Sequence, residues 1–154
     1  MRILAVCTGN ICRSPIAHGI LDQLSTLHNL GWEIDSAGTI GFHSGDSPDS
    51  RAIRVMEAHS VDISHQQSRK LTIEDFDRFD LILALDETHF EEMIQIAKQE
   101  HHHKIKMAMH WHPELQDVSV PDPYCGSLSD FELVYDMLRV SLKAMVQQYK
   151  NTIE

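Results

Sequence analysis

The strongest indication of the fold is the segment 3–15, which reads Ile3-Leu4-Ala5-Val6-Cys7-Thr8-Gly9-Asn10-Ile11-Cys12-Arg13-Ser14-Pro15. Its first five residues are apolar and predict a buried strand at 3–7. Ser14 is expected to cap a helix, with Pro15 at the first helical position, where its missing N–H costs nothing. Gly31 can end this helix. Its apolar face, at helical spacing, carries Ile16, Ile20, Leu24 and Leu27.

Outward from this stretch, apolar runs alternate with helical patterns, which favours an α/β fold with parallel strands. Further strands are predicted at 32–36, 80–85 and 105–109. Helices are predicted at 52–59, 73–79 and 87–100, and a last helix carries one apolar face made of Val134, Met137, Leu138, Ser141, Leu142 and Met145. The sequence shows no internal repeat and no low-complexity linker. It therefore predicts one domain, 1–154.

The net charge limits the possible partners. The 154 residues carry a formal charge of −10, from 23 acidic and 13 basic residues. Such a surface repels nucleic acid and anionic membranes, so neither is expected as a partner. The N-terminal apolar run is too short for a signal peptide, and no segment approaches the length of a membrane span, so we expect a cytoplasmic protein.

The turn after the first strand has the features of an anion site. A strand that runs through a loop into a helix directs backbone N–H groups and the positive end of the helix into one hollow. Gly9 and Asn10 tolerate the left-handed backbone that such a cradle needs. Any phosphate site in so acidic a chain must be built locally, and this turn is the candidate.

Cys7 and Arg13 stand at the two ends of the cradle. A cysteine at the mouth of such a loop, near an arginine, is expected to be held as the thiolate, which is a strong nucleophile. The planar guanidinium of Arg13 can bind two phosphoryl oxygens at once. Taken singly, a cysteine after a strand is usually a core residue and a lone arginine a surface residue. The combination favours phosphoryl transfer.

Residues 6–15 resemble the phosphate loop of the low-molecular-weight protein tyrosine phosphatases. Similar segments fall at 35–39, 72–76, 80–87 and 120–124, so the likeness extends over essentially the whole chain. The resemblance implies a three-layer α/β fold in which a four-stranded parallel sheet is flanked by helices on both faces. It also implies a metal-free, cofactor-free hydrolase that acts on phosphotyrosine-containing proteins, as a monomer or weak homodimer.

The resemblance further implies a two-step mechanism. Cys7 attacks phosphorus while Asp122 protonates the tyrosyl oxygen, and water then hydrolyses the phosphocysteine with Asp122 as base. Asp122 lies between Pro121 and Pro123, which restrict its backbone to extended shapes, although an Asp-Pro pair alone is more often a turn. By the same likeness, phosphate and substrate are bound by Thr8, Gly9, Asn10, Ile11, Cys12, Ser14, Phe42 and Tyr124.

Some of these residues have a more specific expected role. In the family, three side chains form a hydrogen-bond network that supports the loop. The matching positions in this chain are Asn10, Ser14 and Ser36. A family histidine of that network is replaced by Gln66, with His65 one step earlier, and the sequence leaves open which of the two joins it. Ile11, Phe42 and Tyr124 are expected to wall an aryl ring, and Ile11 disfavours phosphoarginine, because similar arginine-phosphate phosphatases carry threonine there.

Two further features, the second loop cysteine and a run of histidines, each allow two interpretations. Cys12 is close enough in sequence to Cys7 for a protective disulfide, or it is a small buried residue. The run His101-His102-His103, with His110 and His112, lacks a recognisable set of ligands and favours a solvated helix end over a metal site.

Three rival functions are compatible with the loop. An arsenate reductase needs further cysteines, for which only Cys125 lies beyond the loop. A phosphoarginine phosphatase is disfavoured by Ile11. A non-catalytic phosphotyrosine-binding module or redox sensor would not need an acid at Asp122.

Overall fold

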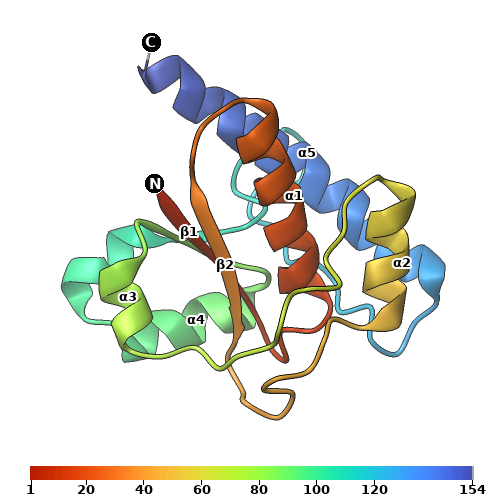
Figure 1. Ribbon diagram of the computed structural model, residues 1–154. Coiled ribbons are helices and arrows are strands. Elements are labelled where there is room, and N and C mark those ends of the chain that lie inside the picture. Colours follow the sequence, from red (N-terminus) through yellow and green to blue (C-terminus); the bar gives the residue numbers. More distant parts are fainter. Residues whose placement is uncertain (154) are drawn as a thin grey trace.

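Four parallel strands in the order β2-β1-β3-β4 form the central sheet of the computed structural model, which describes residues 1–153 (Figure 1). Along the chain the elements are β1 (Arg2–Cys7), α1 (Arg13–Leu27), β2 (Glu33–Gly38), α2 (Ser50–Ala58), α3 (Glu74–Arg78), β3 (Leu81–Ala84), α4 (Glu87–Ile96), the 3-10 helix η1 (Gln99–Lys104), β4 (Ile105–Met107) and α5 (Leu128–Ile153). The predicted α/β order is confirmed.

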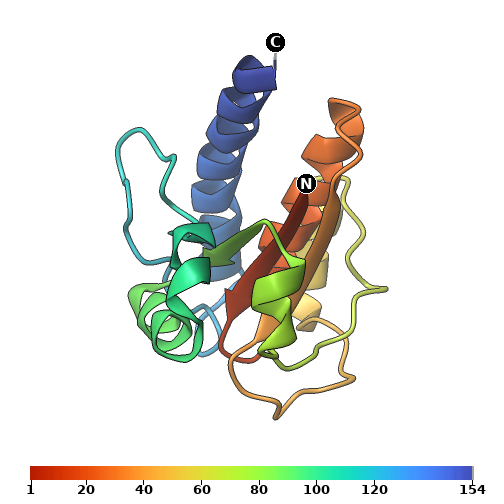
Figure 2. The ribbon, with the colours of Figure 1, turned by 90° about the vertical axis from the view of Figure 1, so that its left-hand side faces the viewer.

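Helices cover both faces of the sheet. Side chains of β1 alternate between two cores: Ile3 and Ala5 pack with residues of α1, α2 and α5, whereas Leu4 and Val6 pack with residues of α3 and α4. Figure 1 shows α1, α2 and α5 on one side of β1 and β2, and α3 and α4 on the other; Figure 2 turns this arrangement by 90°. Because both faces are buried, β1 is a continuous apolar run. The expected three-layer fold is confirmed.

The register of the sheet brings the end of β1 close to the end of β2. Cys7 pairs with Gly38, and a Cβ built on Gly38 would lie 2.6 Å from the Thr8 carbonyl oxygen. A side chain there would therefore displace the backbone that follows Cys7. The carboxyl ends of parallel strands are where α/β sheets place their ligand sites, and the loop 8–12 begins at that edge.

The ends of α1 differ from those predicted. The helix begins at Arg13, and its N-cap residue is Cys12, without a side-chain cap, so the prediction that Ser14 is the cap is wrong. The Ser14 side chain instead hydrogen-bonds within the loop. The helix ends at Leu27, where Asn29 adopts a left-handed backbone (φ 54°) and the Leu30 N–H bonds the Ser25 carbonyl at 2.9 Å. Gly31 lies beyond this terminus.

The predicted helix 87–100 is also shorter in the structure. The chain leaves α4 at Ala97, which is extended (φ −79°, ψ 144°) and packs in the core beside Met93. Residues 99–104 then form η1, which leads into β4. Burial of Ala97 thus overrides the helical pattern of the following polar residues. Within residues 1–153 no helix is both long and apolar enough to cross a bilayer.

Candidate active site

A hollow of about 320 Å³ lies at the carboxyl end of β1. Three segments far apart in the sequence form it: the phosphate loop, the glycine-containing loop after β2, and the segment around Asp122. The lining residues are Cys7, Thr8, Gly9, Ile11, Cys12, Arg13, Ile40, Phe42, His43, Asp122 and Tyr124. The structure therefore brings the predicted nucleophile, arginine and acid to one hollow.

Cys7 is the last residue of β1 and is buried at the base of the hollow. Its Sγ lies 3.0 Å from Ser14 Oγ, in the first turn of α1. A hydroxyl in this position can donate a hydrogen bond to a thiolate and so stabilise it. None of the three cysteines, all within residues 1–153, forms a disulfide.

Arg13 is held rigidly from behind. Its Nη1 donates hydrogen bonds to Asp86 Oδ2 at 2.8 Å and to the Val120 carbonyl at 2.9 Å, and only 4% of its side chain is exposed. Its Nη2 lies 3.9 Å from Asp122 Oδ2. The guanidinium is thereby oriented in advance by a residue that follows β3 and by the segment that precedes Asp122.

Asp86 belongs to the site, although the sequence analysis did not identify it as a site residue. Burial alone would raise the pKa of its carboxyl, but hydrogen bonds from the His89 backbone N–H and from Arg13 lower that pKa below its usual value. Asp86 therefore stays charged at pH 7. The signal was present, since Asp86 follows β3 at the same sheet edge as Cys7 and also caps α4.

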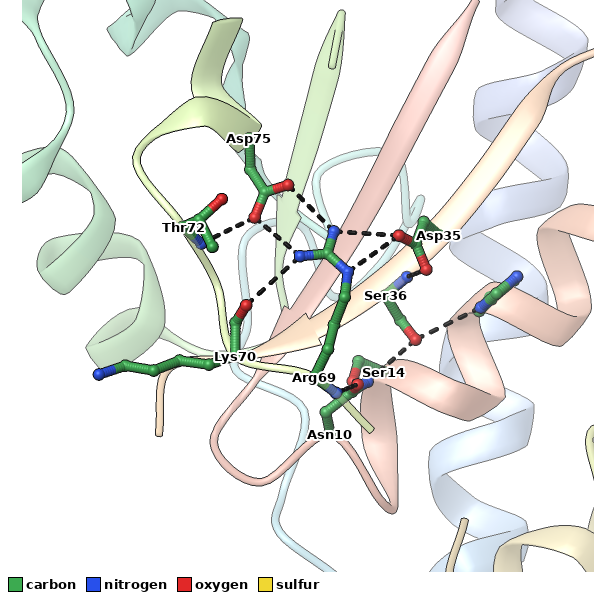
Figure 3. Close-up of polar contacts among 9 residues, drawn as sticks. Asn10, Ser14, Asp35, Ser36, Arg69, Lys70, Thr72 and Asp75 are labelled. Atoms are coloured by element: carbon green, nitrogen blue, oxygen red, sulfur yellow. Dashed lines mark hydrogen bonds and ion pairs between the residues drawn. The ribbon is translucent and has the colours of Figure 1, made fainter. Parts of the chain in front are cut away.

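Asn10 supports the phosphate loop from inside the protein (Figure 3). It adopts a left-handed backbone (φ 57°), whereas Gly9 has no positive φ, so the expected backbone freedom is used at Asn10 alone. Asn10 Nδ2 donates to Ser14 Oγ at 2.8 Å and to Ser36 Oγ at 2.9 Å. Asn10 and Ser14 are buried and do not line the hollow, so their side chains hold the loop rather than face the phosphate.

Arg69 anchors this network to the rest of the fold. Its backbone N–H donates to Asn10 Oδ1 at 3.0 Å. Its side chain binds Asp35 at 3.0 Å and makes a forked contact with Asp75 at 2.9 and 3.0 Å, as Figure 3 shows. Burial would raise the pKa of Asp75, but the Arg69 hydrogen bonds and the Thr72 N–H lower it. The loop is thus supported by a fixed ion-pair cluster.

A residue other than His65 and Gln66, the two expected candidates, reaches the network. His65 is exposed. Gln66 is buried and donates to the Pro15 carbonyl at 3.3 Å, while its Oε1 has no partner among the described residues. His18, on α1, places Nδ1 3.3 Å from Ser36 Oγ and Nε2 3.2 Å from Asp22. The contact crosses from α1 to β2, so local sequence patterns carried no signal for it.

His89 supports the start of the loop. Its Nε2 lies 2.7 Å from Thr8 Oγ1, and its ring is almost fully buried. Burial lowers the pKa of His89 to about 4, although nearby Asp86 opposes this. The imidazole is therefore neutral at pH 7. Its Nδ1 lies 3.1 Å from Asp86 Oδ1 without forming a hydrogen bond, and the His89 backbone N–H donates to that oxygen at 2.9 Å.

Cys12 is the second cysteine of the loop. Burial, reinforced by the charge of Asp49, raises the pKa of its thiol to about 12. Cys12 is therefore a neutral thiol at pH 7, and it lines the hollow.

Two aromatic residues form the rim. Phe42 is 82% exposed and Tyr124 is half exposed, and both line the hollow. His43 was not foreseen as a lining residue; it packs edge-on against Phe42, with ring centroids 4.9 Å apart, and its Nδ1 lies 3.2 Å from Asp46. A flat ring entering the hollow would meet Phe42 and Tyr124 at its mouth.

The histidine run lies elsewhere. It falls in η1, where His101 Nε2 is 2.8 Å from Asp77 Oδ1. Asp77, Glu100 and His101 are the one group of potential ligands within 4.8 Å of each other in residues 1–153, and none of them lines the hollow.

Comparisons with known proteins show the family to which the chain belongs. The family model of the low molecular weight phosphotyrosine protein phosphatases matches residues 2–153. The human low molecular weight phosphotyrosine protein phosphatase is 37% identical over 150 residues, which cover 95% of this chain and 94% of the human one.

Solved structures show the same relation. A protein tyrosine phosphatase from Entamoeba histolytica, with Hepes in its active site, superposes with a TM-score of 0.94 at 30% identity, covering 100% of this chain and 99% of its own. A low molecular weight phosphotyrosine phosphatase from Vibrio cholerae gives 0.90 at 28% identity, covering 99% and 98%. The chain therefore belongs to the low molecular weight phosphotyrosine protein phosphatase family, whose members are protein-tyrosine-phosphatases.

Proposed function

We propose that the chain hydrolyses phosphotyrosine in proteins through a phosphocysteine at Cys7, without a metal or other cofactor. One observation carries the proposal: Cys7, Arg13 and Asp122 line the same hollow, whose mouth is walled by Phe42 and Tyr124. A nucleophile, a cation fixed for phosphoryl oxygens and an exposed carboxylic acid are the groups that this reaction needs.

In the first step, Cys7 Sγ forms a bond to phosphorus as the bond from phosphorus to the tyrosyl oxygen breaks. Asp122 donates its proton to that oxygen, so tyrosine leaves neutral. Arg13 and the backbone N–H groups of the loop hold the equatorial oxygens and stabilise their charge. Because Asp86 and the Val120 carbonyl already fix Arg13, little reorganisation is needed at this step.

In the second step, the Asp122 carboxylate takes a proton from water while the water oxygen attacks phosphorus. The sulfur–phosphorus bond breaks, releasing inorganic phosphate and restoring the thiolate. Ser14 Oγ, 3.0 Å from the sulfur, is placed to donate a hydrogen bond to the departing thiolate.

The walls of the hollow favour a phosphotyrosine side chain. Ile11 offers an apolar contact beside the phosphate, and Phe42 and Tyr124 offer rings for stacking, each worth about 0.5–1.5 kcal/mol beyond area burial. We expect the partners to be phosphotyrosine-containing cytoplasmic proteins, with neither nucleic acid nor membrane. We further expect 1–154 to act as one phosphatase domain, as a monomer or weak homodimer.

The first experiment measures phosphate release from matched phosphotyrosine, phosphoserine and phosphoarginine peptides, in the presence of a chelator. Release from phosphotyrosine alone, abolished in Cys7→Ser, is expected. Release mainly from phosphoarginine would contradict the role given to Ile11. No release from any peptide would favour a reductase or a binding module, and arsenate would then be tested.

A second experiment addresses Asp122. Asp122→Asn should lower kcat/KM strongly, by about 10²–10⁴-fold, on phosphotyrosine. The loss should be much smaller on 2,4-dinitrophenyl phosphate, whose leaving group departs as an anion. Equal losses on both substrates would exclude Asp122 as the acid.

A further inference from the structure

Arg51, in the first turn of α2, reaches across to the segment that bears Asp122. Its Nη1 donates to the Gly126 carbonyl and its Nη2 to the Tyr124 carbonyl, each at 2.9 Å. The guanidinium also lies over the ring of Phe131, 4.5 Å from its centroid. One side chain therefore holds two carbonyls of the 122–126 segment and rests on the start of α5.

The other side of Arg51 is fixed by Asp49. Asp49 Oδ1 accepts from Arg51 Nε at 3.0 Å and Oδ2 accepts from Nη2 at 2.9 Å, and these hydrogen bonds lower the pKa of the Asp49 carboxyl. The Asp49 backbone N–H donates to the Ile11 carbonyl at 2.8 Å. A continuous chain of contacts thus runs from Ile11 in the phosphate loop through Asp49 and Arg51 to Tyr124.

Asp122 depends on its neighbours for its position. Its side chain is 58% exposed, and its Oδ2 lies 3.9 Å from Arg13, too far for a hydrogen bond. Its Oδ1 accepts from the Tyr124 N–H at 3.1 Å. Arg51 binds the carbonyl oxygen of this same residue, Tyr124. An exposed acid in such a segment gains its orientation from the backbone that carries it.

We infer that Arg51 is a positioning residue for the acid: it fastens the 122–126 segment to the phosphate loop, so that Asp122 faces the leaving oxygen. The inference rests on the proposed function, in which Asp122 protonates that oxygen. Arg51 does not line the hollow and touches no reacting atom. Its effect on proton transfer to the leaving oxygen passes through Asp122.

Three variants test this role. Arg51→Ala removes the contacts, Arg51→Lys keeps the charge but cannot hold both carbonyls with one fork, and Arg54→Ala changes an exposed arginine of the same helix as the control. On phosphotyrosine, kcat/KM should fall about tenfold or more in Arg51→Ala, less in Arg51→Lys, and stay within twofold in Arg54→Ala. On 2,4-dinitrophenyl phosphate all three should stay within about threefold of wild type.

A double variant separates positioning from a general loss of structure. In an Asp122→Asn background, Arg51→Ala should change the ratio of the two kcat/KM values by less than twofold, because the acid it positions is absent. Equal losses on the two substrates in Arg51→Ala, or the same change of ratio with and without Asp122, would overturn the inference.

Hydrogen exchange supplies a readout that does not depend on activity. Backbone amides of 122–126 should exchange faster in Arg51→Ala than in wild type, while those of β1 and β3 keep their rates. Unchanged exchange in 122–126 would overturn the inference even if the enzyme is active. If Asp122→Asn shows no dependence on the leaving group, the acid role itself fails, and hydrogen exchange still decides whether Arg51 fastens the segment.

Discussion

Asp86 Oδ2 accepts a hydrogen bond from Arg13 Nη1 at 2.8 Å, so the N-cap residue of α4, which follows β3, orients the first residue of α1, which follows the neighbouring strand β1. Asp86 is partly buried and Arg13 almost completely so. Each charge therefore has a partner in a region of low solvent access, which makes the pair stronger than a surface ion pair.

Asp86→Asn should weaken this hold on Arg13. Asparagine keeps the helix cap at α4 and nearly the same shape but loses the charge. We expect kcat/KM on phosphotyrosine to fall about tenfold or more, since a charge-assisted hydrogen bond is lost. Glu87→Gln, the adjacent exposed residue, serves as the control. A value for Asp86→Asn within twofold of wild type would contradict this role.

Ser14→Ala should make Cys7 less reactive. The variant removes the hydroxyl 3.0 Å from Cys7 Sγ, and a hydrogen bond to a charged group contributes about 1.5–3 kcal/mol. Alkylation of Cys7 by iodoacetate at pH 6, followed by mass spectrometry, should slow about tenfold or more. Ser25→Ala removes another buried hydroxyl of α1, far along the helix, and should leave the rate unchanged. Equal rates in the two variants would disprove the contact's role.

Arg69→Ala should destabilise the fold by about 1–3 kcal/mol at pH 7, because it leaves buried Asp75 and its hydrogen bonds unsatisfied. The lowered pKa of Asp75 gives the sign: its contribution is present above the ordinary value of 3.8 and is lost as the pH falls through the folded-state pKa below it. Urea unfolding should therefore show the difference from wild type shrinking below pH 3.8. A difference independent of pH would point to lost packing instead.

His89→Gln should make the free energy of unfolding less dependent on pH in the acidic range. The unfolded histidine takes up a proton near pH 6.5, whereas the buried one does so only near its lowered pKa of about 4. Between these values the unfolded state binds more protons, so stability falls as the pH drops, by about 3 kcal/mol in all. Urea unfolding at several pH values should show this slope reduced in His89→Gln but kept in His103→Gln, which changes an exposed histidine. The same slope in both would refute the assignment.

Cys12→Ser tests whether the second loop cysteine protects the first. Cys12 stays a neutral thiol at pH 7, so peroxide should react first at Cys7, and a disulfide with Cys12 would prevent further oxidation. After peroxide and then dithiothreitol, wild type should recover most of its activity and Cys12→Ser much less. Equal recovery would leave Cys12 as a small buried residue only.

Much of the fold could be predicted from the amino-acid sequence. An apolar run at 3–7 with no polar alternation predicts a strand buried on both faces, and the structure confirms it. The ends of α1 and α4 were misjudged, because Ser14 turns toward Cys7 and Ala97 turns into the core. Such ends depend on what lies next to them in space.

The strand–loop–helix cradle, with Cys7 and Arg13 at its ends, could be predicted from the amino-acid sequence. So could the stiff Pro-Asp-Pro around Asp122, because both features arise from neighbouring residues. The groups that hold these residues could be identified only in the folded protein: the carbonyl of Val120, 107 residues away, binds Arg13, and Arg51 binds the carbonyls of Tyr124 and Gly126. Hydrogen bonds and ion pairs act over a few ångströms, so they depend on the spatial proximity that packing of the sheet and helices creates and not on distance along the chain.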